Sequence, residues 1–203
     1  MIAVPVPHTA LLIADALAER GLAIVPCFLD VLAVTRLRAH AEALARSGVL
    51  RSAGVGRGDA RTESASIRGD RILWLDPASA DPSEVAYFRA MHQLREVLNR
   101  ELMLGLVELD AHYALYPPGA RYARHRDRFR DDDRRTLSCV LYLNEGWAAD
   151  DGGALRLYTS HGERDVLPSA GTFVAFRSEA FEHEVLPARQ ARLSITGWWL
   201  RRA

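Results

Sequence analysis

Residues 106–119 read LVELDAHYALYPPG, and they divide the chain into two parts of different character. The run at 107–116 is rich in aliphatic and aromatic residues, and it stops at a Pro-Pro-Gly break. Further short runs of this kind, again separated by glycine- or proline-containing breaks, occupy residues 137–144, 154–158, 172–177 and 193–200. Short strands at such spacing predict a β-sandwich or barrel in the second half of the chain.

The residues before this point are typical of helices. Apolar residues recur at helical spacing over residues 9–20, 30–46 and 84–104. A short apolar run at 71–75 predicts a strand, and it follows a segment at 51–70 that is rich in Gly, Ser, Arg and Ala. A segment of that length without apolar content is typically functional or disordered. Helices followed by strands predict an α+β fold with an antiparallel β core.

Composition narrows the classes of function. The 203 residues include 26 acidic and 26 basic residues, so no net charge draws the chain toward nucleic acid or a membrane. The two cysteines, Cys27 and Cys139, are too few for a disulfide framework. No signal peptide or membrane-spanning run is evident. We therefore expect one cytoplasmic domain that acts as a monomer.

The pair His125 and Asp127 forms an HxD motif. On an extended chain, side chains two residues apart leave the same face, so the imidazole and the carboxylate can bind one ion. The motif alone is weak because it lies in a charged stretch of a chain with seven histidines. A surface histidine beside solvated charges is an equally good interpretation at this point.

Two later residues favour the metal-site interpretation. His183 follows the predicted strand at 172–177 and supplies a second imidazole. Two histidines and one carboxylate form the facial triad of non-haem iron(II) oxygenases, which leaves open positions on the metal. Arg192 begins a predicted strand whose alternation places it on one face with Ser194, Thr196 and Trp198. A buried guanidinium requires an anion, either a structural carboxylate or a bound ligand.

The chain resembles the prolyl hydroxylases of the 2-oxoglutarate oxygenases, in particular the hypoxia-factor hydroxylases and their bacterial relatives. The resemblance extends from residue 67 to about residue 199, and its strength lies in the order of the motifs rather than in any one of them. The matching segments are IRGDRILW (67–74), YPPGARYARHRD (116–127), CVLYLN (139–144), GGALRL (152–157), HEV (183–185), Arg192 and ITGW (195–198).

This resemblance implies a double-stranded β-helix, or jelly roll, over about 106–200. Residues 1–105 would then be mainly helical support with a flexible flap at about 51–73. It implies that His125, Asp127 and His183 bind Fe(II). Arg192 and Tyr142 resemble the residues that hold the distal carboxylate of 2-oxoglutarate, and Tyr116 resembles a tyrosine of the same pocket.

For the substrate, the resemblance implies a proline in a mobile loop of a protein. Arg68 and Asp70 resemble the pair that orders the flap. Trp74, Arg135 and Trp198 resemble residues at the entrance for the proline, although Trp74 and Trp198 are equally well explained as core aromatics. The charged loop at 128–134 differs from the animal enzymes, and the chain ends at Ala203 without their C-terminal substrate-binding extension. We therefore expect a different target peptide.

The predicted activity is Fe(II)-, 2-oxoglutarate- and O2-dependent prolyl 4-hydroxylation, with ascorbate as an optional reductant. A translation elongation factor is the candidate target that the bacterial relatives suggest. A small-molecule substrate or another residue type would preserve the cofactor chemistry. A non-catalytic, metal- or oxygen-responsive binding module is the alternative from another class. A zinc hydrolase with the same ligands would leave Arg192 and Tyr142 without a role.

Overall fold

The computed structural model describes residues 7–54, 67–127 and 134–202. Within these ranges the first half of the chain forms three α-helices, which are Pro7–Arg20 (α1), Val31–Arg46 (α2) and Pro82–Leu102 (α3). Asp81 caps the N-terminus of α3, because its carboxylate accepts a hydrogen bond from the Ser83 amide at 2.8 Å. None of the described helices is long and apolar enough to cross a membrane.

The strands form two antiparallel sheets, as the sequence predicts. The larger sheet has the order β1-β9-β6-β11-β4-β3-β2, and its strands are Leu22–Val25 (β1), Phe173–Arg177 (β9), Arg135–Tyr142 (β6), Arg192–Arg201 (β11), Leu106–Tyr116 (β4), Arg71–Trp74 (β3) and Arg51–Ser52 (β2). The smaller sheet has the order β5-β10-β7-β8, and its strands are Tyr122–His125 (β5), Glu182–Val185 (β10), Leu155–Thr159 (β7) and Gly162–Val166 (β8).

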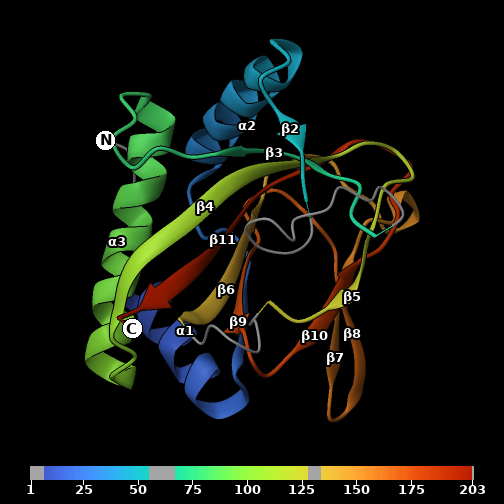
Figure 1. The fold of residues 1–203 in the computed structure, drawn as a ribbon. Helices are drawn as coiled ribbons and strands as arrows, with labels where there is room; N and C mark the ends of the chain where they lie inside the picture. Colours follow the sequence, from blue (N-terminus) through green and yellow to red (C-terminus); the bar gives the residue numbers. More distant parts are fainter. Residues whose placement is uncertain (1–6, 55–66, 128–133, 203) are drawn as a thin grey trace.

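The two sheets and the helices form layers (Figure 1). The helices lie on one side of the larger sheet, and the smaller sheet lies on the other side. Two separate groups of buried residues follow from this arrangement: one joins the helices to the larger sheet, and the other lies between the two sheets. The fold is a jelly roll with supporting helices.

Side-chain alternation along β6 and β11 supplies both buried groups. Leu141 and Ile195 pack toward the helices, whereas Val140, Tyr142 and Arg192 face the space between the sheets. The predicted face of β11 that carries Arg192, Thr196 and Trp198 is therefore confirmed. These two strands also pair with one another, and β6 pairs with β9, so the centre of the sheet is continuous.

The structure differs from the predicted elements mainly in its short strands. The first half of the chain is less purely helical than expected, because β1 and β2 join the larger sheet in addition to β3, which the sequence predicts. Strands β1, β2, β5, β8 and β10 had no strand prediction, and each of them has at most five residues. Most of the expected flap (residues 55–66) and most of the charged loop (residues 128–133) lie outside the described residues.

Candidate metal and 2-oxo acid site

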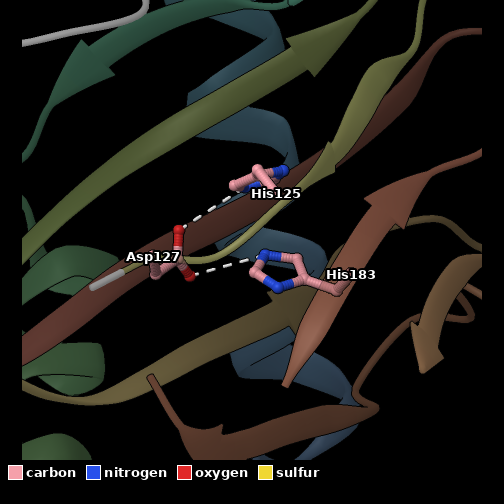
Figure 2. A group of neighbouring side chains, drawn as sticks. All are labelled: His125, Asp127 and His183. Atoms are coloured by element: carbon pink, nitrogen blue, oxygen red, sulfur yellow. Dashed lines mark ion pairs between the residues drawn. The ribbon is translucent and has the colours of Figure 1, made fainter. Parts of the chain in front are cut away.

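His125, Asp127 and His183 come together between the two sheets (Figure 2). Their potential ligand atoms all lie within 4.8 Å of one another. His125 Nε2 lies 3.5 Å from Asp127 Oδ1, and His183 Nε2 lies 3.5 Å from Asp127 Oδ2. Both imidazoles therefore present the same nitrogen toward one carboxylate, which is the arrangement that a single shared cation requires.

The pairing of two strands creates this cluster. His125 on β5 and His183 on β10 are direct partners in the antiparallel register, and their ring centroids are 4.3 Å apart. Asp127 follows β5 by two residues, so the chain that ends this strand brings the carboxylate back to the same point. The HxD motif and the distant histidine, which the sequence could only suggest as a set, thus form one site.

Neighbouring groups orient each potential ligand. His125 Nδ1 lies 2.7 Å from the carbonyl oxygen of Ala123, which assigns the proton to Nδ1 and leaves the lone pair on Nε2. Ser138 Oγ donates a hydrogen bond to Asp127 Oδ2 at 2.7 Å, and it lies 2.9 Å from Ser178 Oγ. Such partners fix the direction of metal ligands before a metal binds.

The charge states of the cluster suit a divalent cation. Burial lowers the pKa of His183 to about 4, so its imidazole is neutral and able to coordinate at neutral pH. Burial disfavours the Asp127 carboxylate, but His183, His125 and the Ser138 hydroxyl outweigh this effect and hold its pKa far below the usual range. Two imidazoles and one carboxylate are the donor set of non-haem Fe(II).

Arg192 supplies a buried cation in the same pocket. Its side chain is almost fully buried, and Nε donates to the carbonyl oxygen of Gly153 at 2.8 Å. No carboxylate among the described residues lies within ion-pair distance of this guanidinium, so the structural salt bridge considered from the sequence is absent there. A buried arginine without an anionic partner fits a ligand carboxylate.

Two tyrosines flank this arginine. The guanidinium carbon of Arg192 lies 5.0 Å from the ring centre of Tyr142 and 5.2 Å from that of Tyr116. The buried Tyr142 hydroxyl makes no hydrogen bond of normal geometry with a described residue. Burial raises the pKa of Tyr142, so its hydroxyl keeps its proton and can donate to a ligand. The three predicted 2-oxoglutarate residues are therefore together.

Gly153 permits the close approach of Arg192. Its φ is +69°, and a Cβ at this position would lie 2.9 Å from the Cβ of Ala188 and 3.3 Å from Cδ of Arg192. A larger residue would displace the arginine and strain the backbone. The second glycine of the Gly-Gly motif at 152–153 thus has a structural reason.

Arg68 and Asp70 form a bidentate ion pair beside the three potential metal ligands. The two bonds measure 2.7 and 3.0 Å, and the Asp70 side chain is fully buried. The guanidinium also lies 4.8 Å from the ring centre of Tyr122, and this ring stacks on His125 with centroids 3.7 Å apart. The described C-terminal end of the expected flap is therefore connected to a potential metal ligand.

Trp74 and Arg135 both lie against Trp198, which lines the pocket. The guanidinium of Arg135 covers the Trp198 ring at 3.8 Å, and the two indole rings are 6.3 Å apart. Trp74 is about half exposed (51%), which argues against a purely structural core role, whereas Trp198 is buried. The lining of this pocket includes Trp198, Arg192 and the three potential metal ligands.

The sequence reasoning missed several residues of this site. Ser138 and His112 line the same pocket, and Tyr122 stacks on His125. Strand alternation could have identified the first two, because Ser138 shares a face with Tyr142 on β6 and His112 shares a face with Tyr116 on β4. A polar residue on an inward face needs a reason, and here the reason is the site.

A larger hollow of about 450 Å³ lies between α3 and β4, with Trp74 at one end. Its lining is mainly apolar and includes none of the three potential metal ligands or Arg192. Size alone would select this hollow, but the chemistry lies in the smaller pocket between the sheets.

Fold and site together define a class. A jelly roll with a largely buried His-Asp-His cluster, and with a buried arginine that has no carboxylate partner among the described residues, is typical of non-haem iron enzymes that use a 2-oxo acid. The profile of the 2OG-Fe(II) oxygenase superfamily matches residues 111–200. The triad and Arg192 all lie within the matched residues.

Individual proteins narrow the class. The chain is 46% identical to a Pseudomonas putida prolyl-4-hydroxylase, covering 96% of this chain and 100% of that one, with a TM-score of 0.85. It is 30% identical to mouse prolyl hydroxylase EGLN3, over 75% of this chain and 67% of that protein. A Trichoplax adhaerens prolyl hydroxylase, solved with a peptide of hypoxia-inducible factor, gives a TM-score of 0.86 at 26% identity and covers 95% of this chain and 89% of its own.

The chain belongs to the prolyl hydroxylase family of the 2OG-Fe(II) oxygenase superfamily. This family uses Fe(II), 2-oxoglutarate and O2, and the donor set and the unpaired arginine described above fit the metal and the dicarboxylate. Some relatives are much longer: the matched region covers 20% of the hypoxia-inducible factor prolyl hydroxylase of Caenorhabditis elegans and 34% of human Egl nine homolog 1.

Proposed function

We propose that this chain is an Fe(II)- and 2-oxoglutarate-dependent dioxygenase that hydroxylates a prolyl residue of a protein at the 4-position. The observation that carries the proposal is the pocket itself, which combines three potential metal ligands, an Arg192 without a carboxylate partner among the described residues, and Trp198, whose ring lies next to Trp74. The 46% identity to a prolyl-4-hydroxylase over nearly the whole chain supports the prolyl substrate.

The residues have separate tasks in this proposal. His125, Asp127 and His183 would hold Fe(II), and Arg192 with the Tyr142 hydroxyl would hold the far carboxylate of 2-oxoglutarate. When bound, these cofactors let O2 convert 2-oxoglutarate to succinate and carbon dioxide while one oxygen atom enters a substrate C–H bond. Leu155, Phe176 and Val185 line the pocket with apolar surface and exclude water from it.

The substrate side of the pocket has its own residues. Trp74, Trp198 and Arg135 would receive the proline, since aromatic faces pack well against a pyrrolidine ring. Arg68 and Asp70 would anchor the flap over the bound peptide, because their ion pair fixes the chain at the pocket rim. The first target to test is a translation elongation factor with a proline in a mobile loop. This choice rests on the bacterial members of the family. We expect the enzyme to act in the cytoplasm as a monomer.

The test combines binding with product analysis. Purified protein is given Fe(II) and 2-oxoglutarate without oxygen, and their binding is measured. Oxygen and a cell lysate are then added, and prolyl peptides are analysed by mass spectrometry. We expect one proline to gain the mass of one oxygen atom with wild-type protein and with Arg164→Ala, a control at an exposed arginine on β8. His125→Ala and Arg192→Ala should abolish it.

Other outcomes would change the proposal. Succinate formation without a modified proline would preserve the oxygenase and redirect the search to small molecules or other residue types. Failure to bind both Fe(II) and 2-oxoglutarate would end the oxygenase proposal and leave a non-catalytic binding module.

A further inference from the structure

His112 is a buried polar residue of the pocket that the proposed chemistry leaves unused. It lies on β4, opposite Trp74 of β3 and Thr196 of β11 in the strand register. Its side chain lines the same pocket as the three potential metal ligands and is 1% exposed. The Trp74 and Trp198 rings lie 5.0 and 5.7 Å away, so His112 sits behind the expected entrance for the proline.

The surroundings of His112 fix which nitrogen can accept a hydrogen bond. Nδ1 lies 3.1 Å from the carbonyl oxygen of Tyr113, which can only accept, so Nδ1 carries the proton. Nε2 then carries the lone pair. Burial, followed by the charge of Arg68, lowers the pKa of His112 to about 4, so the ring is neutral at physiological pH and Nε2 remains an acceptor.

Within the described part of the chain, this acceptor has no donor. None of the described residues forms a hydrogen bond with His112 Nε2, although the atom is buried. Trp198 Nε1, a donor on the neighbouring ring, is equally buried and equally without a described partner. Buried polar atoms are rarely left unpaired because their desolvation is not repaid. Two such atoms in one pocket, one acceptor and one donor, match a ligand that offers both an N–H and a C=O.

A peptide group is a ligand of that kind. Proline has no N–H of its own, so the first backbone donor after its ring is the N–H of the following residue. We propose that His112 is a specificity-determining residue whose Nε2 accepts a hydrogen bond from the N–H of the residue that follows the target proline. The inference rests on the proposed prolyl hydroxylase function and names a feature of its substrate.

The proposal implies selection against targets that lack this N–H. A second proline directly after the target residue removes the donor, and the acceptor then stays buried and unpaired. The enzyme should therefore disfavour Pro-Pro sequences at the target position. A hydrogen bond between neutral groups corresponds to a preference of about 3- to 10-fold.

Two small probes isolate the N–H. N-acetyl-proline N-methylamide carries it, and N-acetyl-proline methyl ester replaces it with an oxygen atom of similar shape. Binding of each probe to the enzyme loaded with Fe(II) and 2-oxoglutarate is measured without oxygen, from the fluorescence of the pocket tryptophans. Wild-type protein should bind the amide about 3- to 10-fold more tightly than the ester.

Variants at His112 separate its effect from general differences between the probes. His112→Leu removes the acceptor and should abolish the preference, whereas His112→Gln can place an amide oxygen near the original Nε2 and should restore it. The ester carbonyl is a weaker hydrogen-bond acceptor than the amide carbonyl, but this difference affects all variants equally. The proposed bond is therefore measured by how much the amide-to-ester affinity ratio changes between wild type and variant. Thermal unfolding of each variant confirms that it is folded.

Each result has a defined meaning. Equal binding of amide and ester by wild-type protein, or a preference that persists in His112→Leu, would overturn the inference while leaving the prolyl hydroxylase proposal intact. If neither probe binds although a protein proline is hydroxylated, the pocket does not recognise this peptide group and the inference fails. If no proline is hydroxylated in any protein, the proposed function itself fails.

Discussion

The two faces of the larger sheet differ in what they bury. The face toward the helices is apolar, with Leu141, Phe173 and Ile195 almost completely buried in one cluster. The face toward the smaller sheet carries polar groups at equal depth, among them His112, Arg192 and Tyr142. The same strands supply both faces, because neighbouring residues on β6 and β11 point in opposite directions.

This difference separates stability from function within single strands. Apolar groups on the helix-facing side gain free energy by leaving water. The buried polar groups on the other side lose hydration, and several have no described partner that compensates for it. We infer that the helix-facing side holds the sheet together, whereas the other side is retained for the ligands that complete its bonds.

The largest expected effect is the loss of metal binding in His183→Ala. Removing one of three ligands should weaken Fe(II) binding by more than about 100-fold, because even the loss of a group that only orients a ligand costs roughly 10- to 100-fold. Hydroxylation should become undetectable, while metal-free protein still unfolds cooperatively. His92→Ala, at an exposed histidine on α3, is the control. Fe(II) affinity within about tenfold of wild type would show that the site lies elsewhere.

On the helix-facing side, Leu141→Ala should act on stability alone. This side chain is fully buried in the cluster that joins the helices to the sheet, so truncation should lower the free energy of unfolding by about 2–5 kcal/mol. Turnover per folded molecule should not change. Denaturant unfolding and activity at low temperature measure the two quantities, with the exposed Leu167→Ala as control at about 0.5 kcal/mol or less. A large fall in turnover would break the proposed separation of the faces.

Ser138→Ala should have a smaller effect, and it should change metal binding rather than stability. The variant loses the hydroxyl that donates to Asp127 Oδ2, so Fe(II) affinity should fall about 10-fold, the lower end of the range for groups that orient ligands. Ser194→Ala is a matched control, because Ser194 is buried on the neighbouring strand and the one hydrogen bond described for its side chain is to Thr196, at 3.4 Å. Equal metal affinity in both variants would remove Ser138 from the site.

How much of the fold and of the site could be predicted from the sequence depends on how many residues each sequence pattern spans. The long helices and the longer strands were predictable because their apolar periods extend over many residues. The residues of the candidate site were predictable as a set, since the HxD pair, His183 and Arg192 stand in ordered motifs. Their meeting point was not, because it depends on the pairing of His125 with His183, and β10 is only four residues long.

The sequence also could not predict which buried polar atoms of the site lack a hydrogen-bond partner among the described residues. Alternation can place His112 on the inward face of β4, but only coordinates show that one nitrogen meets the Tyr113 carbonyl and the other meets no donor among the described residues. The same holds for Arg192, for which the sequence left both a salt bridge and a bound anion open. The absence of a carboxylate partner among the described residues favours the anion.

The smallest effect concerns Cys139, which adjoins Ser138 on β6 but points toward the helices. It is 1% exposed, and burial raises the pKa of its thiol to about 12. The thiolate is the reactive form, so at pH 8 Cys139 should resist alkylation in native protein, while the exposed Cys27 reacts. Mass spectrometry should count one modified thiol in native protein and two in denaturant. Rapid native modification of Cys139 would mean that the helix-facing side opens easily, and the distinction between a closed scaffold face and a ligand-binding face would no longer hold.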